Sequence, residues 1–138
     1  MESLEITTTL GKMSALSAGR GPLVLLLHGF PDTKETWISQ IECLAANGFR
    51  AVAVSLRGYE PTTIPMDSDF TDVTLARDVI NIMDALGETA CHLVGHDWGA
   101  AIAYRAANLF PDRFTSLTTM AVPHAGRFAN TAFFTPKQ

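Results

Sequence analysis

A glycine-flanked aspartate lies where an apolar stretch of the sequence gives way to a stretch rich in alanine. Gly95, Asp97 and Gly99 form the pattern G-x-D-x-G, preceded by Leu93-Val94 and followed by Ala100-Ala101. Glycines at this spacing let the backbone turn sharply between a strand and a helix, so that the central side chain stands exposed above a sheet. An aspartate is already an anion at neutral pH and attacks a saturated carbon without the help of a base. We therefore expect Asp97 to be a nucleophile.

A simpler role for Asp97 is to cap the helix that follows, because aspartate is a favoured N-cap residue. The two interpretations differ in where the carboxylate points. A capping side chain folds against its own helix, whereas a nucleophile faces the rest of a site.

The motif His28-Gly29-Phe30-Pro31 follows the apolar run Leu23–Leu27 and is a second candidate part of the site. Gly29 permits a bend that points the backbone N–H of Phe30 into a pocket, and Pro31 fixes the exit direction of the chain. The amide of Trp98, directly after Asp97, is the natural second donor. Two such donors form an oxyanion hole, in which each donor contributes about 3 to 4 kcal/mol. The alternative is an incidental His-Gly pair in a loop.

Four histidines are present, and we assign none of them as the base that activates water. His28 and His96 flank the expected pocket as structural or pocket-lining residues, and His28 and Pro31 are the expected substrate-binding residues. His92, early in a predicted strand, is expected to have a partner or to lie on the surface. His124 either lines the pocket or simply ends a strand.

Alternating strands and helices must position these residues. The unbroken apolar runs at 23–27 and 51–54 are typical of strands buried on both faces of a parallel sheet. Strands separated by helices imply right-handed crossovers, which bring residues 28–31 and Asp97 to the same edge of the sheet. The full set of expected elements is an edge hairpin at 4–18, strands at 23–27, 51–54, 91–94 and 114–122, and helices at 35–47, 72–86 (capped by Thr71) and 100–108.

The string Gly95-His96-Asp97-Trp98-Gly99-Ala100, together with the motif at 28–31, resembles the aspartate-nucleophile branch of the α/β-hydrolase superfamily, the epoxide hydrolases and haloalkane dehalogenases. The resemblance extends from about Leu4 to His124. It implies an α/β fold with a mostly parallel sheet and flanking helices. It also implies a small-molecule substrate, an epoxide or an alkyl halide, which Asp97 converts to an alkyl-enzyme ester with neither cofactor nor metal.

Two positions favour the epoxide hydrolases. Haloalkane dehalogenases tend to carry asparagine where Phe30 stands, and the fluoroacetate type follows its aspartate with arginine rather than Trp98, although the indole N–H of Trp98 would suit a halide. Arg57-Gly58-Tyr59 resembles another landmark of the family, in which the arginine anchors a loop. The family usually has aspartate where this chain has Ser55, so the anchoring contacts of the loop are expected to differ.

The resemblance covers only the first part of such an enzyme. Residues 1–124 are expected to form the N-terminal part of an α/β-hydrolase core, and residues 125–138 a tail or the start of a missing lid. Because the lid, the C-terminal strands, the triad acid and the histidine base have no counterpart, we expect an incomplete core and an alkylated enzyme that does not turn over. The rival is a non-catalytic module that binds a small ligand, or pairs with itself or a complementary chain through an exposed sheet edge.

The bulk properties fit one globular domain. The 138 residues are 47% hydrophobic and 17% charged, with a formal net charge of -4 and a pI near 5.4. This acidic balance argues against binding to nucleic acid or anionic membranes. The acidic start Met1–Glu5 and the absence of a long apolar run predict a soluble cytoplasmic protein. Cys43 and Cys91 are expected to be small core residues rather than a disulfide or metal ligands.

Overall fold

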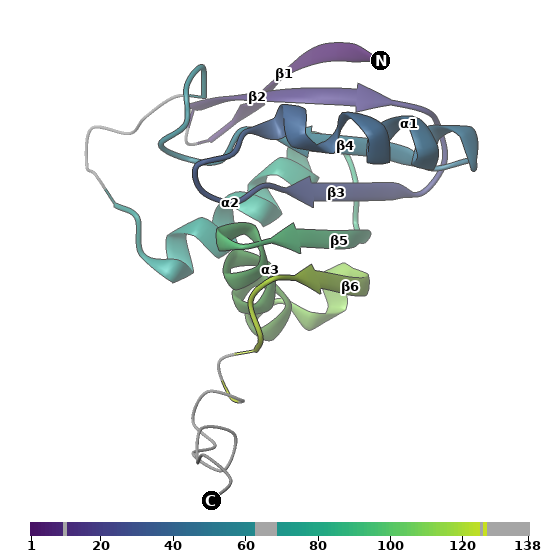
Figure 1. Cartoon of the computed structure of the whole chain (residues 1–138). Helices are drawn as coiled ribbons and strands as arrows, with labels where there is room; N and C mark the ends of the chain where they lie inside the picture. The colour runs from purple at the N-terminus through teal and green to yellow at the C-terminus, as the bar shows by residue number, and fades with distance from the viewer. Residues whose placement is uncertain (10, 63–68, 125, 127–138) are drawn as a thin grey trace, which may run out of the picture.

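The computed structural model describes residues 1–9, 11–62, 69–124 and 126. Residues 63–68 of the loop predicted after the second buried strand, and the predicted tail 125–138 apart from Gly126, lie outside the described residues. The elements, labelled in Figure 1, are β1 (Glu2–Thr8), β2 (Gly11–Ala18), β3 (Leu23–Leu27), a 3-10 turn (Lys34–Trp37), α1 (Ile38–Ala46), β4 (Arg50–Val54), α2 (Asp72–Ala85), β5 (Cys91–His96), α3 (Trp98–Leu109), a second 3-10 turn (Pro111–Arg113) and β6 (Phe114–Met120).

Six strands form one sheet in the order β1-β2-β4-β3-β5-β6. β1 and β2 form an antiparallel hairpin at one edge, β2 is antiparallel to β4, and β4, β3, β5 and β6 run parallel. In Figure 1 the arrowheads of β3, β5 and β6 point to the left and that of β2 points to the right. The predicted fold class, a mostly parallel sheet with flanking helices and an edge hairpin, is confirmed.

The register of the parallel strands brings their carboxyl ends level with one another. Leu27, the last residue of β3, pairs with Val54 at the end of β4 and with Gly95 near the end of β5. The chain therefore leaves the sheet at His28, Ser55 and the turn after β5 along one common edge. Loops at this edge are where open α/β sheets hold their sites.

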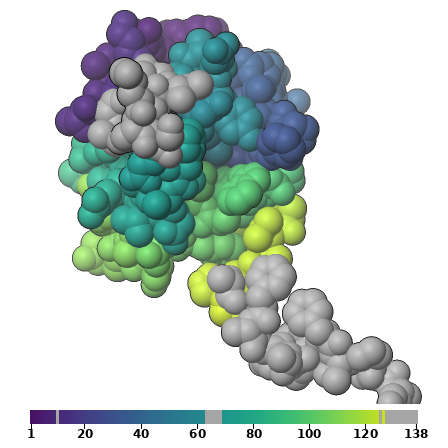
Figure 2. Space-filling model, turned by 90° about the vertical axis from the view of Figure 1, so that its left-hand side faces the viewer, coloured from purple at the N-terminus to yellow at the C-terminus, as the bar shows by residue number. Residues whose placement is uncertain are grey.

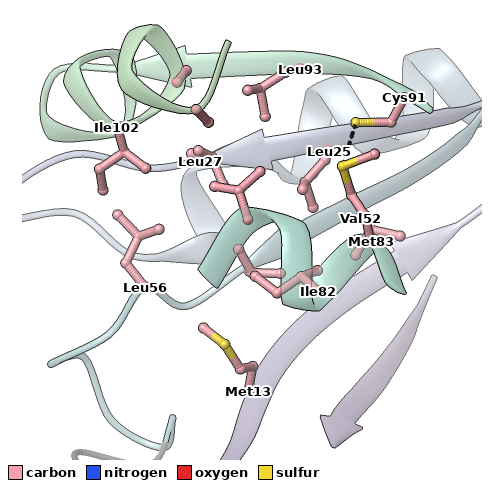
Figure 3. Packing of buried hydrophobic residues seen from close by; sticks show 14 of the residues in the cluster. Met13, Leu25, Leu27, Val52, Leu56, Ile82, Met83, Cys91, Leu93 and Ile102 are labelled. Atoms are coloured by element: carbon pink, nitrogen blue, oxygen red, sulfur yellow. Dashed lines mark hydrogen bonds between the residues drawn. The ribbon is translucent and has the colours of Figure 1, made fainter. Parts of the chain in front are cut away.

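Helices cover both faces of the sheet. On one face, Ile41 of α1 and Trp37 pack with Val24 and Leu26 of β3. Successive residues of a strand point to opposite faces, so Leu25 and Leu27 lie on the other face, under α2 and α3. Figure 3 shows this larger core, in which residues of β3, β4 and β5 meet Ile82 and Met83 of α2 and Ile102 of α3. Burying each such side chain stabilises the fold by about 1.5–3 kcal/mol.

The helix boundaries follow local hydrogen bonds. Thr71 caps α2 as predicted, because its Oγ1 accepts from the backbone N–H of Thr74 at 3.3 Å. The helix predicted at 35–47 begins instead as a 3-10 turn, with Thr36 N donating to Thr33 O at 3.2 Å, and becomes α-helical only at Ile38. The strand predicted at 114–122 ends at Met120, where the backbone turns away.

The two cysteines differ in their surroundings. Cys91 is buried, with Sγ 3.6 Å from Met83 Sδ (Figure 3), and burial raises the pKa of its thiol to about 12. Cys43 is exposed on α1, so its predicted place in the core is wrong. The inward face of that helix is defined by Ile41, and Cys43, two residues later, points to solvent. Along the described chain, no helix combines the length and apolar character needed to cross a bilayer.

Candidate active site

The backbone of Asp97 lies in a strained conformation between β5 and α3. Its φ of 55° and ψ of -118° are unusual for a residue other than glycine. The flanking glycines permit close backbone contacts: a Cβ on Gly95 would lie 2.8 Å from Ala100 Cα, and a Cβ on Gly99 would lie 2.7 Å from His28 O. Both positions of the G-x-D-x-G pattern therefore exclude side chains, and the turn stays as sharp as the sequence predicts.

The carboxylate of Asp97 is not used as a conventional helix cap. Asp97 is the N-cap residue of α3 but makes no side-chain capping hydrogen bond, and the first carbonyl acceptor of the helix is its backbone oxygen. Instead, Oδ1 accepts a hydrogen bond from the backbone N–H of Phe30 at 3.0 Å. The structure thus brings the two sequence motifs, 67 residues apart, into direct contact at the common edge of the sheet.

Backbone amides stabilise the ionised form of this carboxylate. The N–H of Phe30, and after it that of Trp98, lower the pKa of Asp97 below the ordinary aspartate value. Asp97 is half-buried, and burial raises the pKa less than the two amides lower it. Asp97 is therefore a partly exposed anion that faces two N–H groups.

The loop that carries the Phe30 amide packs directly on Asp97. A Cβ on Gly29 would lie 2.8 Å from Asp97 Oδ1, so a side chain at residue 29 would collide with the carboxylate. The loop closes in a turn in which Asp32 N donates to Gly29 O at 3.1 Å, and the Phe30–Pro31 peptide bond is cis. Pro31 and the Phe30 ring, which is 67% exposed, both lie at the surface.

His28 lies behind this loop rather than at its surface. Its side chain is fully buried, Nδ1 lies 2.8 Å from Gly29 O, and Nε2 accepts from Leu56 N at 3.1 Å. Burial lowers the pKa of the imidazole. The residue that the sequence suggests for substrate binding is therefore placed where it contacts two loops and no open pocket.

The loop after β4 is anchored by an ion pair that the sequence analysis missed. Arg57 donates from Nε and Nη2 to the two carboxylate oxygens of Asp78, both at 2.7 Å, and both side chains are buried. A second contact joins Lys34 Nζ to Ser55 Oγ at 3.3 Å. Arg57 is thus an anchor, as the resemblance implies, and the signal for its partner is a single acidic residue, Asp78, on the inward face of α2.

Two adjoining hollows open at the edge where the parallel strands end, and Trp98 lines both. This edge of the sheet faces the viewer in Figure 2. One, of about 460 Å³, is lined by Phe30, Leu56, Arg57, Gly58, Tyr59, Phe70, Leu75, Trp98 and Ile102. The other, of about 420 Å³, runs along α3 and includes Tyr104, Arg105 and His124. Phe70 and Trp98 line both hollows, and they are 46% and 60% exposed, respectively. Exposed aromatic side chains beside an anion suit a small apolar ligand.

The remaining three histidines have different surroundings. His92 has the expected partner, with Nδ1 2.8 Å from Ser116 Oγ. His124 lies edge-on to the ring of Tyr104, at a centroid distance of 5.0 Å. His96 ends β5, and its positive charge when protonated favours the ionised form of Asp97. Within the described ranges, no group of three or more His, Cys, Asp and Glu side chains could hold a metal ion.

Comparison with known proteins places this geometry in context. The profile of the alpha/beta hydrolase fold matches residues 22–135. The chain is 38% identical over 134 residues to an epoxide hydrolase of Caballeronia sordidicola, covering 96% of this chain and 41% of that protein. It is 41% identical over 123 residues to epoxide hydrolase 3 of Siraitia grosvenorii, covering 88% of this chain and 39% of that protein.

The similarity extends to the fold. The crystal structure of an epoxide hydrolase from Vigna radiata superposes with a TM-score of 0.85 and 36% sequence identity, covering 89% of this chain and 39% of that one. The chain thus spans about two fifths of the length of the relatives it matches.

Proposed function

The chain belongs to the alpha/beta hydrolase fold family, and from this premise we propose that Asp97 is the nucleophile of an epoxide hydrolase-like reaction. The observation that carries the proposal is the hydrogen bond from Phe30 N–H to Asp97 Oδ1 at 3.0 Å, made to a carboxylate on a strained turn. A carboxylate serving only the fold would cap its helix, and this one does not. The similarity to epoxide hydrolases supports the choice of substrate class.

The hydrogen bond assigns different roles to the two carboxylate oxygens. Oδ1 is held by the Phe30 amide, so we assign the attack to Oδ2. Attack by Oδ2 on an epoxide carbon forms a C–O bond to the enzyme and breaks a C–O bond of the ring, whose oxygen takes the electron pair and then a proton from water. The product is a hydroxyalkyl ester of Asp97 in which Oδ1 is the carbonyl oxygen.

Hydrolysis of that ester places a negative charge on Oδ1. The amides of Phe30 and Trp98 lower the pKa of Asp97 in the free protein, and the same two donors would form the oxyanion hole during attack by water. This second step also needs a general base. We assign no described residue to that role. His28 has both nitrogens in hydrogen bonds, His92 is paired with Ser116 and His124 packs edge-on against Tyr104. His96, directly before Asp97, is interpreted as a structural or pocket-lining residue.

Intact-mass spectrometry after incubation with styrene oxide tests the first step. We expect one added molecule of epoxide per chain, mapped to Asp97 and lost in Asp97→Asn. The matched control is Asp112→Asn, because Asp112 is an exposed carboxylate just before β6, at the opposite edge of the sheet. Peptide mapping separates the ester from alkylation of the exposed Cys43 thiol. Labelling that is unchanged in Asp97→Asn would contradict the proposal.

An alkyl halide is the competing substrate class. The exposed Trp98 indole follows the nucleophile and offers an N–H donor for a departing halide. Incubation with a bromoalkane, followed by a halide assay, separates the two classes. We expect no bromide release above that of Asp97→Asn, and Asp97-dependent release at a rate exceeding epoxide labelling would replace the epoxide assignment.

A further inference from the structure

The hydrogen bonds around His28 fix the position of its single proton. Nδ1 lies 2.8 Å from the carbonyl oxygen of Gly29, and Nε2 lies 3.1 Å from the backbone nitrogen of Leu56. A carbonyl oxygen only accepts, and a backbone N–H only donates. Nδ1 must therefore carry the proton, and Nε2 must be the acceptor, so the imidazole is neutral.

The carbonyl that His28 holds belongs to the same peptide group as the N–H that holds Asp97. Gly29 O accepts from His28 Nδ1 and, at 3.1 Å, from Asp32 N, while the adjoining Phe30 N donates to Asp97 Oδ1 at 3.0 Å. A peptide group is planar, with its C=O and N–H pointing in opposite directions. Fixing the oxygen therefore fixes the direction of the N–H.

We propose that His28 is a positioning residue for the nucleophile, acting through the Gly29–Phe30 peptide group, which its Nδ1–H orients and polarises. A hydrogen bond to a carbonyl strengthens the N–H of the same peptide as a donor, because bonds in a chain polarise one another. The chain runs from Leu56 N–H through His28 and the peptide group to Asp97. This inference rests on the proposed role of Asp97.

The burial of His28 separates this role from direct action on a substrate. The side chain is 0% exposed, and its only lone pair on nitrogen, at Nε2, already accepts from Leu56. A general base needs a free lone pair at the reacting water. His28 lacks one, so it acts on the reaction only through the loop that it holds.

Protonation would break this arrangement, because an added Nε2–H would face a backbone N–H instead of accepting from it. Burial lowers the pKa of His28, and the Lys34 ammonium acts in the same direction, while the hydrogen bond to Gly29 O and the Asp32 and Glu35 carboxylates favour the protonated form. The ring of Tyr59 lies edge-on at a centroid distance of 4.6 Å. The balance keeps His28 neutral near pH 7.

NMR on the whole chain tests the proposal without substrate. The measured quantities are the ¹⁵N shifts of the His28 ring, the Phe30 amide proton shift, and the pKa of the Asp97 carboxyl from its ¹³C shift. In His28→Phe, which keeps a ring but loses both bonds, we expect the Phe30 amide proton to move upfield and the pKa of Asp97 to rise toward its ordinary value. In His28→Asn, whose amide can still donate to Gly29 O, we expect a smaller rise.

His92→Phe is the matched control, since His92 also has a hydrogen-bond partner but lies early in β5, away from the loop. We expect it to leave both Asp97 readouts unchanged. Circular dichroism establishes that each variant is folded. If His28→Phe leaves the Phe30 shift and the pKa of Asp97 at their wild-type values, the inference is overturned.

A titration keeps the inference testable if the His28 variants do not fold. In Asp97→Asn, which removes the carboxyl titration, the Phe30 amide shift should change with the same midpoint as the His28 ring, below pH 6.5. If the Phe30 amide shift does not change as His28 ionises, the inference is overturned.

Labelling with styrene oxide distinguishes failure of this inference from failure of the proposed function. We expect His28→Phe to slow labelling of Asp97 roughly 10- to 100-fold, as displacement of a reacting group does. Equal rates in wild type and variant overturn the role of His28 and leave the function standing. If the NMR experiments give the expected shifts but styrene oxide never labels Asp97 of the wild-type protein, the proposed function is overturned. His28 would then position Asp97 without any role in catalysis.

Discussion

Gly29 limits where the Asp97 carboxylate can lie. Because a Cβ at residue 29 would lie 2.8 Å from Oδ1 and 3.0 Å from Cγ, we expect Gly29→Ala to push the carboxylate off the Phe30 amide. The pKa of Asp97 should then rise toward its ordinary value, and labelling by epoxide should fall. Chemical denaturation should show a loss of about 1–3 kcal/mol, as for other overpacked positions.

Gly87→Ala separates this steric effect from simple loss of stability. Gly87 has a φ of 76° and open space around it, so an added Cβ strains the backbone but touches nothing. We expect a loss of roughly 1 kcal/mol from that strain, with the pKa of Asp97 unchanged. An equal pKa shift in both variants would contradict a direct contact between Gly29 and Asp97.

His28 should give the protein a pH-dependent stability between about pH 6.5 and its own lower folded pKa. Burial lowers the pKa of His28 in the folded state, so the unfolded chain binds the proton more readily. The free energy of unfolding must then fall as pH drops below about 6.5, by at most about 1.4 kcal/mol per pH unit for one proton, and stay flat above.

Urea denaturation at pH 7.5 and 5.5 measures this slope, and His28→Gln should reduce it. The carboxylates of Asp32, Glu35, Asp69 and Asp97 have lowered pKa values, so their contributions to stability are lost only at more acidic pH. A slope that is identical in wild type and His28→Gln would show that burial of this imidazole does not govern the acid side of the stability curve.

The buried ion pair between Arg57 and Asp78 joins the loop after β4 to helix α2. Both hydrogen bonds are 2.7 Å long, and the two side chains are only 4% and 9% exposed. Asp78→Ala would leave a buried guanidinium without its carboxylate, so we expect a loss of about 3–5 kcal/mol in urea denaturation. The side chain of Tyr59, on the same loop as Arg57, should change its position in this variant.

Asp84→Ala on the same helix is the matched control. Asp84 also pairs with an arginine, Arg113 at 2.6 Å, but its side chain is 60% exposed. Exposed pairs contribute about 0–1 kcal/mol. Losses of similar size in the two variants would mean that the Arg57–Asp78 pair is no more important than a surface contact.

Sequence patterns predicted the elements well wherever burial determines them. The apolar runs of β3 and β4 are buried on both faces, and the apolar face of α2 points into the core, as expected. The start of α1 and the end of β6 were displaced by a few residues. The start of α1 depends on the turn at Thr33–Thr36, and the end of β6 depends on the backbone at Ala121, which has a φ of 71°. Neither feature can be recognised from the spacing of hydrophobic residues.

The arrangement of the whole sheet explains why part of the site was predictable from the sequence and part was not. Two motifs that each follow a parallel strand must meet at one edge, so the approach of Phe30 to Asp97 followed from the order of elements. The partners of His28 and Arg57 did not follow, because Leu56 contributes only a backbone N–H and Asp78 is one acidic residue among several. Such contacts depend on three-dimensional distances that no spacing encodes.

The outer edge of β6 is not paired with another described strand. In the described part of the chain, β6 pairs with β5 alone, and Leu117 and Met120 are 36% and 41% exposed. A strand edge with open N–H and C=O groups is a template for another strand. We therefore expect this chain to self-associate as its concentration rises, with sedimentation velocity showing a shift from monomer toward dimer.

A charge on β6 should weaken the association, because lysines on two paired copies of the strand would repel one another. Leu117→Lys places the charge on β6, and Leu109→Lys places it at the end of α3 on a residue of nearly equal exposure, 37% against 36%. We expect Leu117→Lys to shift the transition to higher concentration and Leu109→Lys to leave it in place. A protein that stays monomeric at every concentration would contradict association through β6. Equal effects of the two lysine substitutions would also contradict it, and would indicate association through apolar surface contacts in general.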